Sequence, residues 1–170
     1  ELDGDDEISF TAYSSDQIES LNDSTVREQL ISSGLWTSFK TRPFSKVPSI
    51  DSNPYAIFVN CMDTNPLSVD PSIVINEDKE DFLYGLSILA KLNSNILYCC
   101  SGPELKLEIN DPKIVHARFS GPHPSGLSGT HIHKLAPASN SRVSWSINYQ
   151  DVIAVGKLFL TGKISVERII

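Results

Sequence analysis

The chain has 170 residues, 40% of them hydrophobic, and its 14 basic and 21 acidic side chains give a net charge of −7. This size and composition exclude a disordered or fibrous protein and fit one globular domain with its own hydrophobic core. Nucleic acid is not an expected partner, because residues 1–28 hold nine acidic side chains against one arginine and no dense basic stripe occurs elsewhere.

The three cysteines, Cys61, Cys99 and Cys100, are odd in number and form no C-x-x-C pair. They predict neither a disulfide framework nor a zinc ribbon, and they favour a reducing compartment. No apolar run approaches the roughly 20 residues of a membrane-spanning helix, and acidic residues stand where a signal peptide would carry Lys or Arg. We therefore expect a soluble domain.

The N-terminal region predicts one secure helix. Residues 1–21 are interpreted as an acidic linker or the edge of a preceding β-rich domain, with one short strand at 8–12. A helix is expected from Asn22 through Ser33, and either Asn22 or Thr25 can cap its first turn.

The middle of the chain has the pattern of a parallel sheet. Segment 36–53 holds two prolines and is expected to be an irregular loop. Continuous apolar runs at 55–60 and 96–100 predict strands buried on both faces, and a third strand is expected at 113–119. A helix between them, from about residue 76 to 92, completes a strand, helix, strand unit.

The C-terminal part predicts a loop, a helix and a strand. Residues 121–133 are rich in Gly, Pro and His and are expected to be a loop, and a helix capped by Asn148 is expected at 149–161. Residues 164–170 resemble a strand that leads into a next domain. The predicted fold is an α/β, Rossmann-like domain over residues 22–163, with an open, mostly parallel sheet and flanking helices.

Histidines suggest a metal site in one place. His131 and His133 would share one face of a strand, and His123 could add a third ligand from the loop. However, no acidic residue lies between 121 and 133, so a fourth ligand would have to come from a distant part of the chain. We expect loop hydrogen bonding rather than metal binding.

Catalytic arrangements have little support. No Gly-x-Ser-x-Gly elbow follows a strand, and Cys61 fits a small buried hydrophobe better than a nucleophile. The carboxylate pairs Asp63 with Asp70 and Glu77 with Asp81 fall at turn and helix-cap positions, where a structural role explains them. We expect no catalytic residue in this chain.

Nucleotide binding is supported by the expected fold but not by the motifs. An open parallel sheet binds ligands beyond the carboxyl ends of its strands. No Gly-x-Gly-x-x-Gly or Gly-x-x-x-x-Gly-Lys-Ser/Thr follows a strand, and the Gly-x-x-Gly at 126–129 is a much weaker signal. A stand-alone flavin or nucleotide enzyme therefore remains the alternative to be tested.

One further segment, FKTRPFSK at 39–46, alternates aromatic and basic residues, namely Phe39, Lys40, Arg42, Phe44 and Lys46. A solvated surface loop is the simplest explanation. A binding site for a planar, oxygen-bearing ring is the alternative, in which the aromatic rings stack on the ligand while Arg42 or Lys46 donates to its oxygens.

Four strings of unusual composition occur in a fixed order: GLWTSFKTRPFSKVP at 34–48, MDTNPL at 62–67, GPHPSGLSGTHIH at 121–133 and WSINYQDVIAVGKLFLTG at 145–162. In these strings, and in their order, the chain resembles the NqrA family, which provides one of the subunits of the bacterial sodium-translocating NADH:quinone oxidoreductase. Together the strings support the resemblance over most of residues 22–170. The chain would then be a middle portion of an NqrA protein.

The resemblance implies a peripheral subunit on the cytoplasmic face of the bacterial inner membrane. The six-subunit complex moves electrons from NADH to ubiquinone and exports Na⁺, and its FAD, FMN, riboflavin and iron–sulfur centre belong to other subunits. The fold is expected to be similar to the flavoprotein subunit of respiratory complex I without the glycine-rich flavin loop. The fragment alone is not expected to be catalytic or to hold a cofactor.

The resemblance also implies contact with ubiquinone or with the membrane-embedded neighbouring subunit. We assign this contact to Phe39, Lys40, Arg42, Phe44 and Lys46. The family motif fixes no chemical role for His123, His131 and His133, which we assign to loop structure or subunit contact, with no metal.

Overall fold

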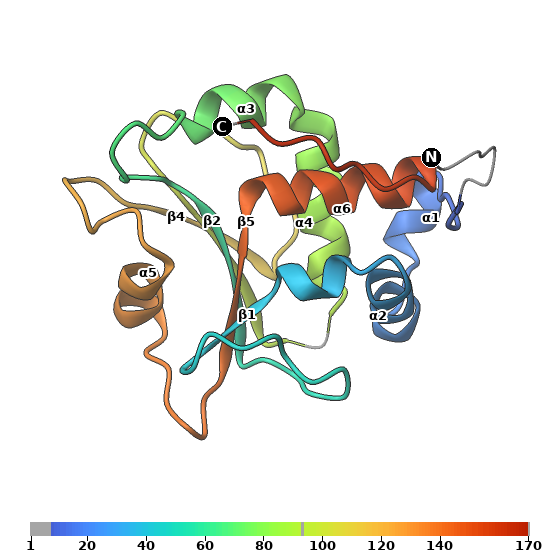
Figure 1. The fold of residues 1–170 in the computed structure, drawn as a ribbon, viewed down its shortest axis with the longest axis horizontal. Helices are drawn as coiled ribbons and strands as arrows, with labels where there is room; N and C mark the ends of the chain where they lie inside the picture. The colour runs from blue at the N-terminus through green and yellow to red at the C-terminus, as the bar shows by residue number, and fades with distance from the viewer. Residues whose placement is uncertain (1–7, 93, 170) are drawn as a thin grey trace, which may run out of the picture.

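The computed structural model describes residues 8–92 and 94–169, and its centre is a five-stranded sheet of order β1-β5-β2-β3-β4 (Figure 1). The strands are β1 (Lys40–Arg42), β2 (Ala56–Cys61), β3 (Ile96–Ser101), β4 (Ile114–Arg118) and β5 (Ser144–Asn148). β2 is parallel to both β3 and β5, β3 is parallel to β4, and β1 runs antiparallel to its neighbour β5. The prediction of an α/β domain with an open, mostly parallel sheet is confirmed.

Helices cover the two faces of this sheet unequally (Figure 1). In the described part of the chain, one face carries α1 (Ser15–Glu19), α2 (Asp23–Ser32), the 3-10 helix η1 (Leu35–Ser38), α3 (Pro71–Glu77), α4 (Lys79–Ala90) and α6 (Tyr149–Thr161). The opposite face carries α5 (Ser128–Leu135). The main core therefore lies under the larger set of helices.

Alternation along the strands divides the core into two layers. On β2, Ile57 and Val59 face the main core, while Ala56 and Phe58 face α5. The smaller layer holds Ile132 of α5 against these two residues. Both faces of the central strands are thus buried, which explains their continuous apolar sequence.

The caps that the sequence predicts form at α2 and α6. The Asn22 side chain accepts the Thr25 N–H at 2.9 Å, so Asn22, and not Thr25, caps α2. Asn148 caps α6 in the same way by accepting the Gln150 N–H at 3.0 Å. The glycines that end them, Gly34 after α2 and Gly162 after α6, have φ angles of 80° and 70°.

The prediction that a helix starts at residue 76 and runs to about 92 is wrong in its first residue. Pro71 begins α3, because the Asp70 carboxylate accepts the Ser72 N–H at 2.9 Å and proline needs no N–H partner at the first helical position. The chain then bends at Asp78, with φ −108° and ψ 37°, before α4 begins at Lys79.

The expected strands at the two ends of the chain are absent from the described residues. Residues 8–12 form no strand, and instead the Phe10 N–H donates to the carbonyl oxygen of Gly162 at 2.8 Å. Residues 164–169 also form no strand, because this segment folds back on α6, where Arg168 pairs with Asp151 at 2.9 Å. Residues 1–7 of the expected linker and residue 170 lie outside the described part.

Two segments expected to be loops contain regular structure. Within 36–53 the chain forms the end of η1 and the whole of β1, which pairs with β5. Within 121–133 it forms the first turns of α5, so His131 and His133 lie on a helix. β5 itself was not predicted, although its sequence SWSIN alternates serine with apolar residues, a pattern that fits a strand.

Candidate functional site

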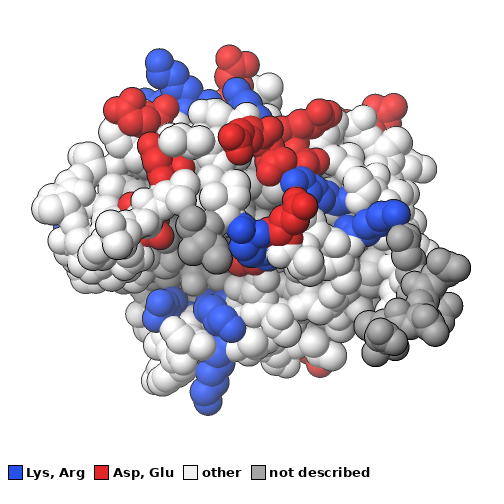
Figure 2. Space-filling model, turned by 45° about the horizontal axis from the view of Figure 1, so that its top comes forward, with Lys and Arg blue, Asp and Glu red and all other residues white. Residues whose placement is uncertain are grey.

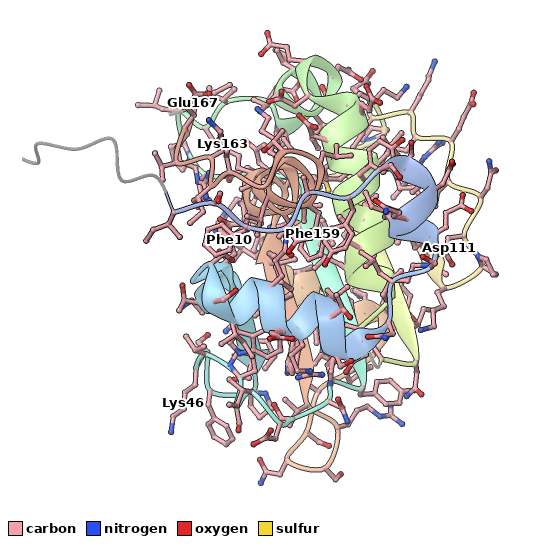
Figure 3. All side chains as sticks on the ribbon, turned by 90° about the vertical axis from the view of Figure 1, so that its right-hand side faces the viewer. Phe10, Lys46, Asp111, Phe159, Lys163 and Glu167 are labelled. Carbon is pink, nitrogen blue, oxygen red and sulfur yellow. The ribbon has the colours of Figure 1, made fainter. Side chains whose placement is uncertain are left out.

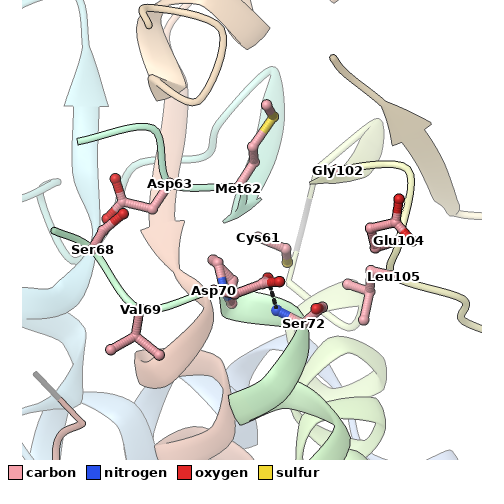
Figure 4. A pocket seen from close by; sticks show the side chains of 11 residues that line it. Cys61, Met62, Asp63, Ser68, Val69, Asp70, Ser72, Gly102, Glu104 and Leu105 are labelled. Carbon is pink, nitrogen blue, oxygen red and sulfur yellow. Dashed lines mark hydrogen bonds between the residues drawn. The ribbon is translucent and has the colours of Figure 1, made fainter. Parts of the chain in front are cut away.

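A crevice opens where β2 and β3 end, at the position where sheets of this type bind ligands (Figure 4). Its walls come from the end of β2, the loop before α3 and the turn after β3, which starts at Gly102. Its volume is about 240 Å³, below the roughly 300–1,000 Å³ of cavities that hold drug-sized molecules. A complete dinucleotide is larger than this space.

Carboxylates line the crevice. Asp63, Asp70 and Glu104 all contribute to its walls (Figure 4). Asp63 accepts the backbone N–H of Asn65 at 2.8 Å, and Asp70 occupies the first free N–H of α3. These two backbone N–H groups are therefore already bonded to carboxylates and not free for a phosphate, and the local potential is negative. The structural roles expected for Asp63 and Asp70 are confirmed.

Burial near this crevice also shifts the pKa values of neighbouring titratable groups. Burial raises the pKa of the Tyr149 phenol, and the carboxylates of Asp63 and Asp70 raise it further. Burial also raises the pKa of the Cys61 thiol, whose sulfur lies 3.7 Å from that of Cys99. A protonated thiol at the end of β2 is a poor nucleophile, in agreement with the expected role of Cys61 as a buried hydrophobe.

The segment 39–46 does not form one surface. Phe39 is fully buried, with its ring centroid 5.4 Å from those of both Trp36 and Trp145. A ring in this position belongs to the main core, so the expectation that Phe39 stacks on a ligand is wrong for this conformation. Phe44, in contrast, is 71% exposed.

Two basic residues of this segment, Lys40 and Arg42, lie on the face of the sheet opposite to Phe39. Lys40 and Arg42 stand directly opposite Ser146 and Ser144 of β5, so they share the face that carries α5. Among the described residues, Arg42 Nε and Ser144 Oγ are buried polar atoms without a hydrogen-bond partner. Lys46 is exposed, and its backbone closes the turn by two hydrogen bonds with Thr41.

The three histidines of the Gly-, Pro- and His-rich segment are separated. His131 and His133 are two residues apart on α5, and this spacing points their side chains to opposite sides of the helix. His131 is buried, and its Nε2 lies 2.8 Å from the Ser125 carbonyl oxygen, so it donates there. Burial lowers the pKa of His131. His133 is exposed, and His123 lies with Nδ1 3.3 Å from Thr64 Oγ1.

This arrangement removes the geometric basis of the metal hypothesis. The shared strand face that would have oriented His131 and His133 is replaced by a helix. No group of three His, Cys, Asp or Glu side chains within the described ranges is arranged to hold a metal ion. The loop-structure role is supported for His131, whose ring packs 4.2 Å from that of Phe119.

Sequence reasoning missed two residues of these surfaces. Glu104 joins the crevice from the turn after β3, and its place follows only from the pairing of β3 with β2. Arg142 lies over the Tyr55 ring at 4.4 Å, beside the start of β5. A lone arginine in the loop 137–143 carries no signal until β5 itself is recognised.

Comparisons with known proteins match nearly the whole chain. The family described as NqrA second alpha/beta domain matches residues 21–164. NqrA proteins of Na(+)-translocating NADH-quinone reductases are 47% identical to this chain in Glaesserella parasuis, 48% in Neisseria gonorrhoeae and 49% in Histophilus somni. Each match covers 99% of this chain and 38% of the relative, so the chain spans well under half of their length.

Proposed function

Because the chain belongs to the family of NqrA second alpha/beta domains, we propose that it serves as a flavin-free portion of NqrA in a Na⁺-translocating NADH-quinone reductase. In this role it contributes to assembly and to the quinone end of the complex. FAD, FMN, riboflavin and the iron–sulfur centre would belong to other subunits. Electron transfer from NADH to ubiquinone and export of Na⁺ would be properties of the whole assembly.

The acidic crevice at the ends of β2 and β3 is the main observation that supports this proposal. A Rossmann-like fold related to the flavoprotein subunit of respiratory complex I would bind its coenzyme there. Here the crevice is small, Asp63, Asp70 and Glu104 would repel a pyrophosphate, and Asp70 already caps α3. In the described chain, no glycine with a positive φ directly follows β2 or β3 to bring backbone amides close to a phosphate.

The rival function, a stand-alone flavin or nucleotide enzyme, makes the opposite prediction for the purified chain. We expect no binding of FMN or NADH at micromolar concentration, measured by isothermal titration calorimetry and by flavin fluorescence. Replacing two of the three crevice carboxylates, Asp63→Asn with Glu104→Gln, is a control for charge alone and is expected to leave binding undetectable, because the phosphate loop is still missing. Micromolar binding by the parent chain would refute the proposed function.

The segment 40–46 is proposed as the quinone contact. Phe44 projects into solvent, Lys46 stands two residues away, and Arg42 Nε has no partner among the described residues. These groups would pack on a quinone ring or its isoprenoid tail and donate to its oxygens. The alternative is that they dock the membrane-embedded neighbouring subunit.

Photo-crosslinking separates the two. A photoreactive quinone analogue bound to the complete complex is expected to label residues within 40–46. Excess ubiquinone should compete with this labelling, and the Phe44→Asn variant should reduce it. Labelling elsewhere in the complex with none in this segment would refute the quinone contact and favour docking of a neighbouring protein.

A peripheral position on the cytoplasmic face of the bacterial inner membrane completes the proposal. No helix in residues 8–92 and 94–169 is both long and apolar enough to cross a bilayer. In the proposed peripheral position, the portion would reach quinone from the membrane surface.

A further inference from the structure

A rigid turn after β1 holds an aromatic ring out into solvent. Phe44 and Ser45 are consecutive non-glycine residues with φ angles of 85° and 50°. Residues other than glycine rarely adopt this left-handed region, so the surrounding structure must hold the turn in place. The Thr41 N–H donates to the Lys46 carbonyl oxygen at 2.8 Å, and the Ser45 N–H donates to that of Thr41 at 2.8 Å. The exposed position of Phe44 is therefore built into the turn.

The end of the molecule that carries this turn combines apolar and basic side chains. Residues 37–50 contain three basic residues and no acidic one before Asp51, and Val47 and Ile50 are exposed in this stretch as Phe44 is. The loop before β5 adds Arg142, which lies over Tyr55. The Tyr55 N–H donates to the Val143 carbonyl oxygen at 2.7 Å, and Arg42 is paired with Ser144, so these loops adjoin.

The opposite end of the molecule is acidic. Residues 62–81, which include the crevice loop and α3, hold six acidic side chains and one lysine. Figure 2 shows most acidic residues in the upper part of the view, where lysine and arginine also lie, and mainly lysine and arginine along its lower edge. In Figure 3, Lys46 lies at one end, and Glu167 lies at the other together with Lys163. The excess of acidic residues in 62–81 would turn this end away from a negatively charged surface and the other end toward it.

We propose that this basic apolar end, formed by Arg42, Phe44, Lys46, Val47 and Arg142, binds the surface of a bilayer that contains anionic lipids. Phe44 enters the headgroup region while the cations remain at the level of the phosphates. Interfacial amphipathic helices bury Phe, Trp and Leu side chains at this level of the bilayer, and each nearby Lys or Arg strengthens attachment to anionic lipids.

The composition favours a lipid surface over a protein partner. The centres of protein–protein interfaces are depleted in lysine, whereas here Lys46 stands two residues from the exposed ring of Phe44. A lipid surface requires only protruding apolar groups with cations between them, and the turn presents this pattern. The inference shares residues with the proposed quinone contact but does not depend on it.

Vesicles without quinone test the inference separately from the proposed function. The purified 170-residue chain is sedimented with vesicles of phosphatidylcholine alone and with vesicles of phosphatidylcholine and phosphatidylglycerol in equal parts, at low and at high salt. Binding is expected only to the phosphatidylglycerol vesicles, and added salt should weaken it because it screens the cations.

Matched variants locate the binding surface. Phe44→Asn removes the ring and suits a left-handed backbone, and it should weaken binding about tenfold. Lys46→Gln should weaken it about fivefold, the effect of one cation near an anionic membrane. The controls lie at the acidic end. Leu67 is exposed and has a φ of 64°, so Leu67→Asn matches the first change, and Lys79→Gln matches the second.

The outcomes are distinct. Weakened vesicle binding by Phe44→Asn and Lys46→Gln, with both controls at the parent level, supports the inference. Equal binding to both vesicle types, no binding to phosphatidylglycerol vesicles at low salt, or equal loss in the controls overturns it. Absence of binding would leave the surface for a protein partner, while the flavin and quinone-labelling experiments would remain valid tests of the proposed function.

Discussion

The crossing of α4 and α6 depends on two glycines, and we predict that adding one methyl group there destabilises the domain. The two helices cross in Figure 1. Gly156 of α6 faces the backbone of α4, and a Cβ on it would overlap the carbonyl oxygen of Asp81. Gly85 of α4 faces α6 in the same way, and its Cβ would overlap the carbonyl oxygen of Val152. Because the obstacle in both cases is backbone, a side-chain rotation cannot relieve it.

The magnitude for Gly156→Ala follows from two opposing effects. Overpacking a core position costs about 1–3 kcal/mol, and a clash with main chain belongs at the upper end of this range. Alanine in a helix interior gains about 1 kcal/mol over glycine. The net loss in the free energy of unfolding is therefore about 2 kcal/mol, which corresponds to a decrease in Tm of about 4–8 °C in a domain of this size.

Urea unfolding followed by circular dichroism measures this loss. Gly156→Ala should lower the midpoint without changing the slope. Gly129→Ala is the control, because Gly129 lies in α5 and a Cβ there meets no atom within 4 Å. It should leave the midpoint unchanged or raise it. If Gly156→Ala unfolds at the same urea concentration as the parent chain, the close approach of the two helices is not what requires glycine.

Three further predictions concern single side chains. Burial lowers the pKa of His131 and of His116 below the usual 6.5, so the unfolded chain binds more protons just below that value, and the free energy of unfolding should decrease as the pH falls below about 6.5. Urea midpoints across pH measure this decrease, and His131→Asn should reduce the slope; an unchanged slope would contradict the assignment. Asn148→Ala removes the cap of α6 and should cost about 1 kcal/mol in the same assay, whereas a midpoint equal to that of the parent chain would show that the cap contributes nothing. Burial raises the pKa of the Cys61 and Cys100 thiols, so iodoacetamide should modify neither of them in the native chain but both in urea, as mass spectrometry can show; rapid native modification would revive the nucleophile hypothesis.

Sequence reasoning predicted correctly the parts of the fold in which the local pattern of apolar residues matches their burial in the structure. β2 is apolar up to Asn60 and β3 up to Ser101 because both of their faces are covered, and α6 shows a helical stripe between a capping Asn148 and a terminating Gly162. In these segments the local pattern and the tertiary environment agree.

The segments that sequence reasoning missed are those whose burial depends on distant contacts. Ser144 and Ser146 of β5 are buried, although an alternation of serine and apolar residues usually indicates a strand with one face exposed to solvent. Phe39 is buried because Trp145, which is far along the chain, packs against it. No local pattern in FKTRPFSK shows that its first aromatic ring belongs to the core and its second to the surface.

The sequence allowed a prediction about the candidate site through a motif that it lacks, and not through the residues that line the site. The lack of a glycine-rich loop could be read directly from the sequence, and it led to the expectation of no bound coenzyme. The carboxylates that would repel a phosphate could not be recognised as one group from the sequence, because Glu104 is far in sequence from Asp63 and Asp70. The parallel pairing of β2 with β3 brings these carboxylates to one edge of the sheet. That pairing therefore turns scattered acidic residues into a negatively charged crevice, and it leaves residues 37–50, which carry no acidic side chain, at the other end of the domain.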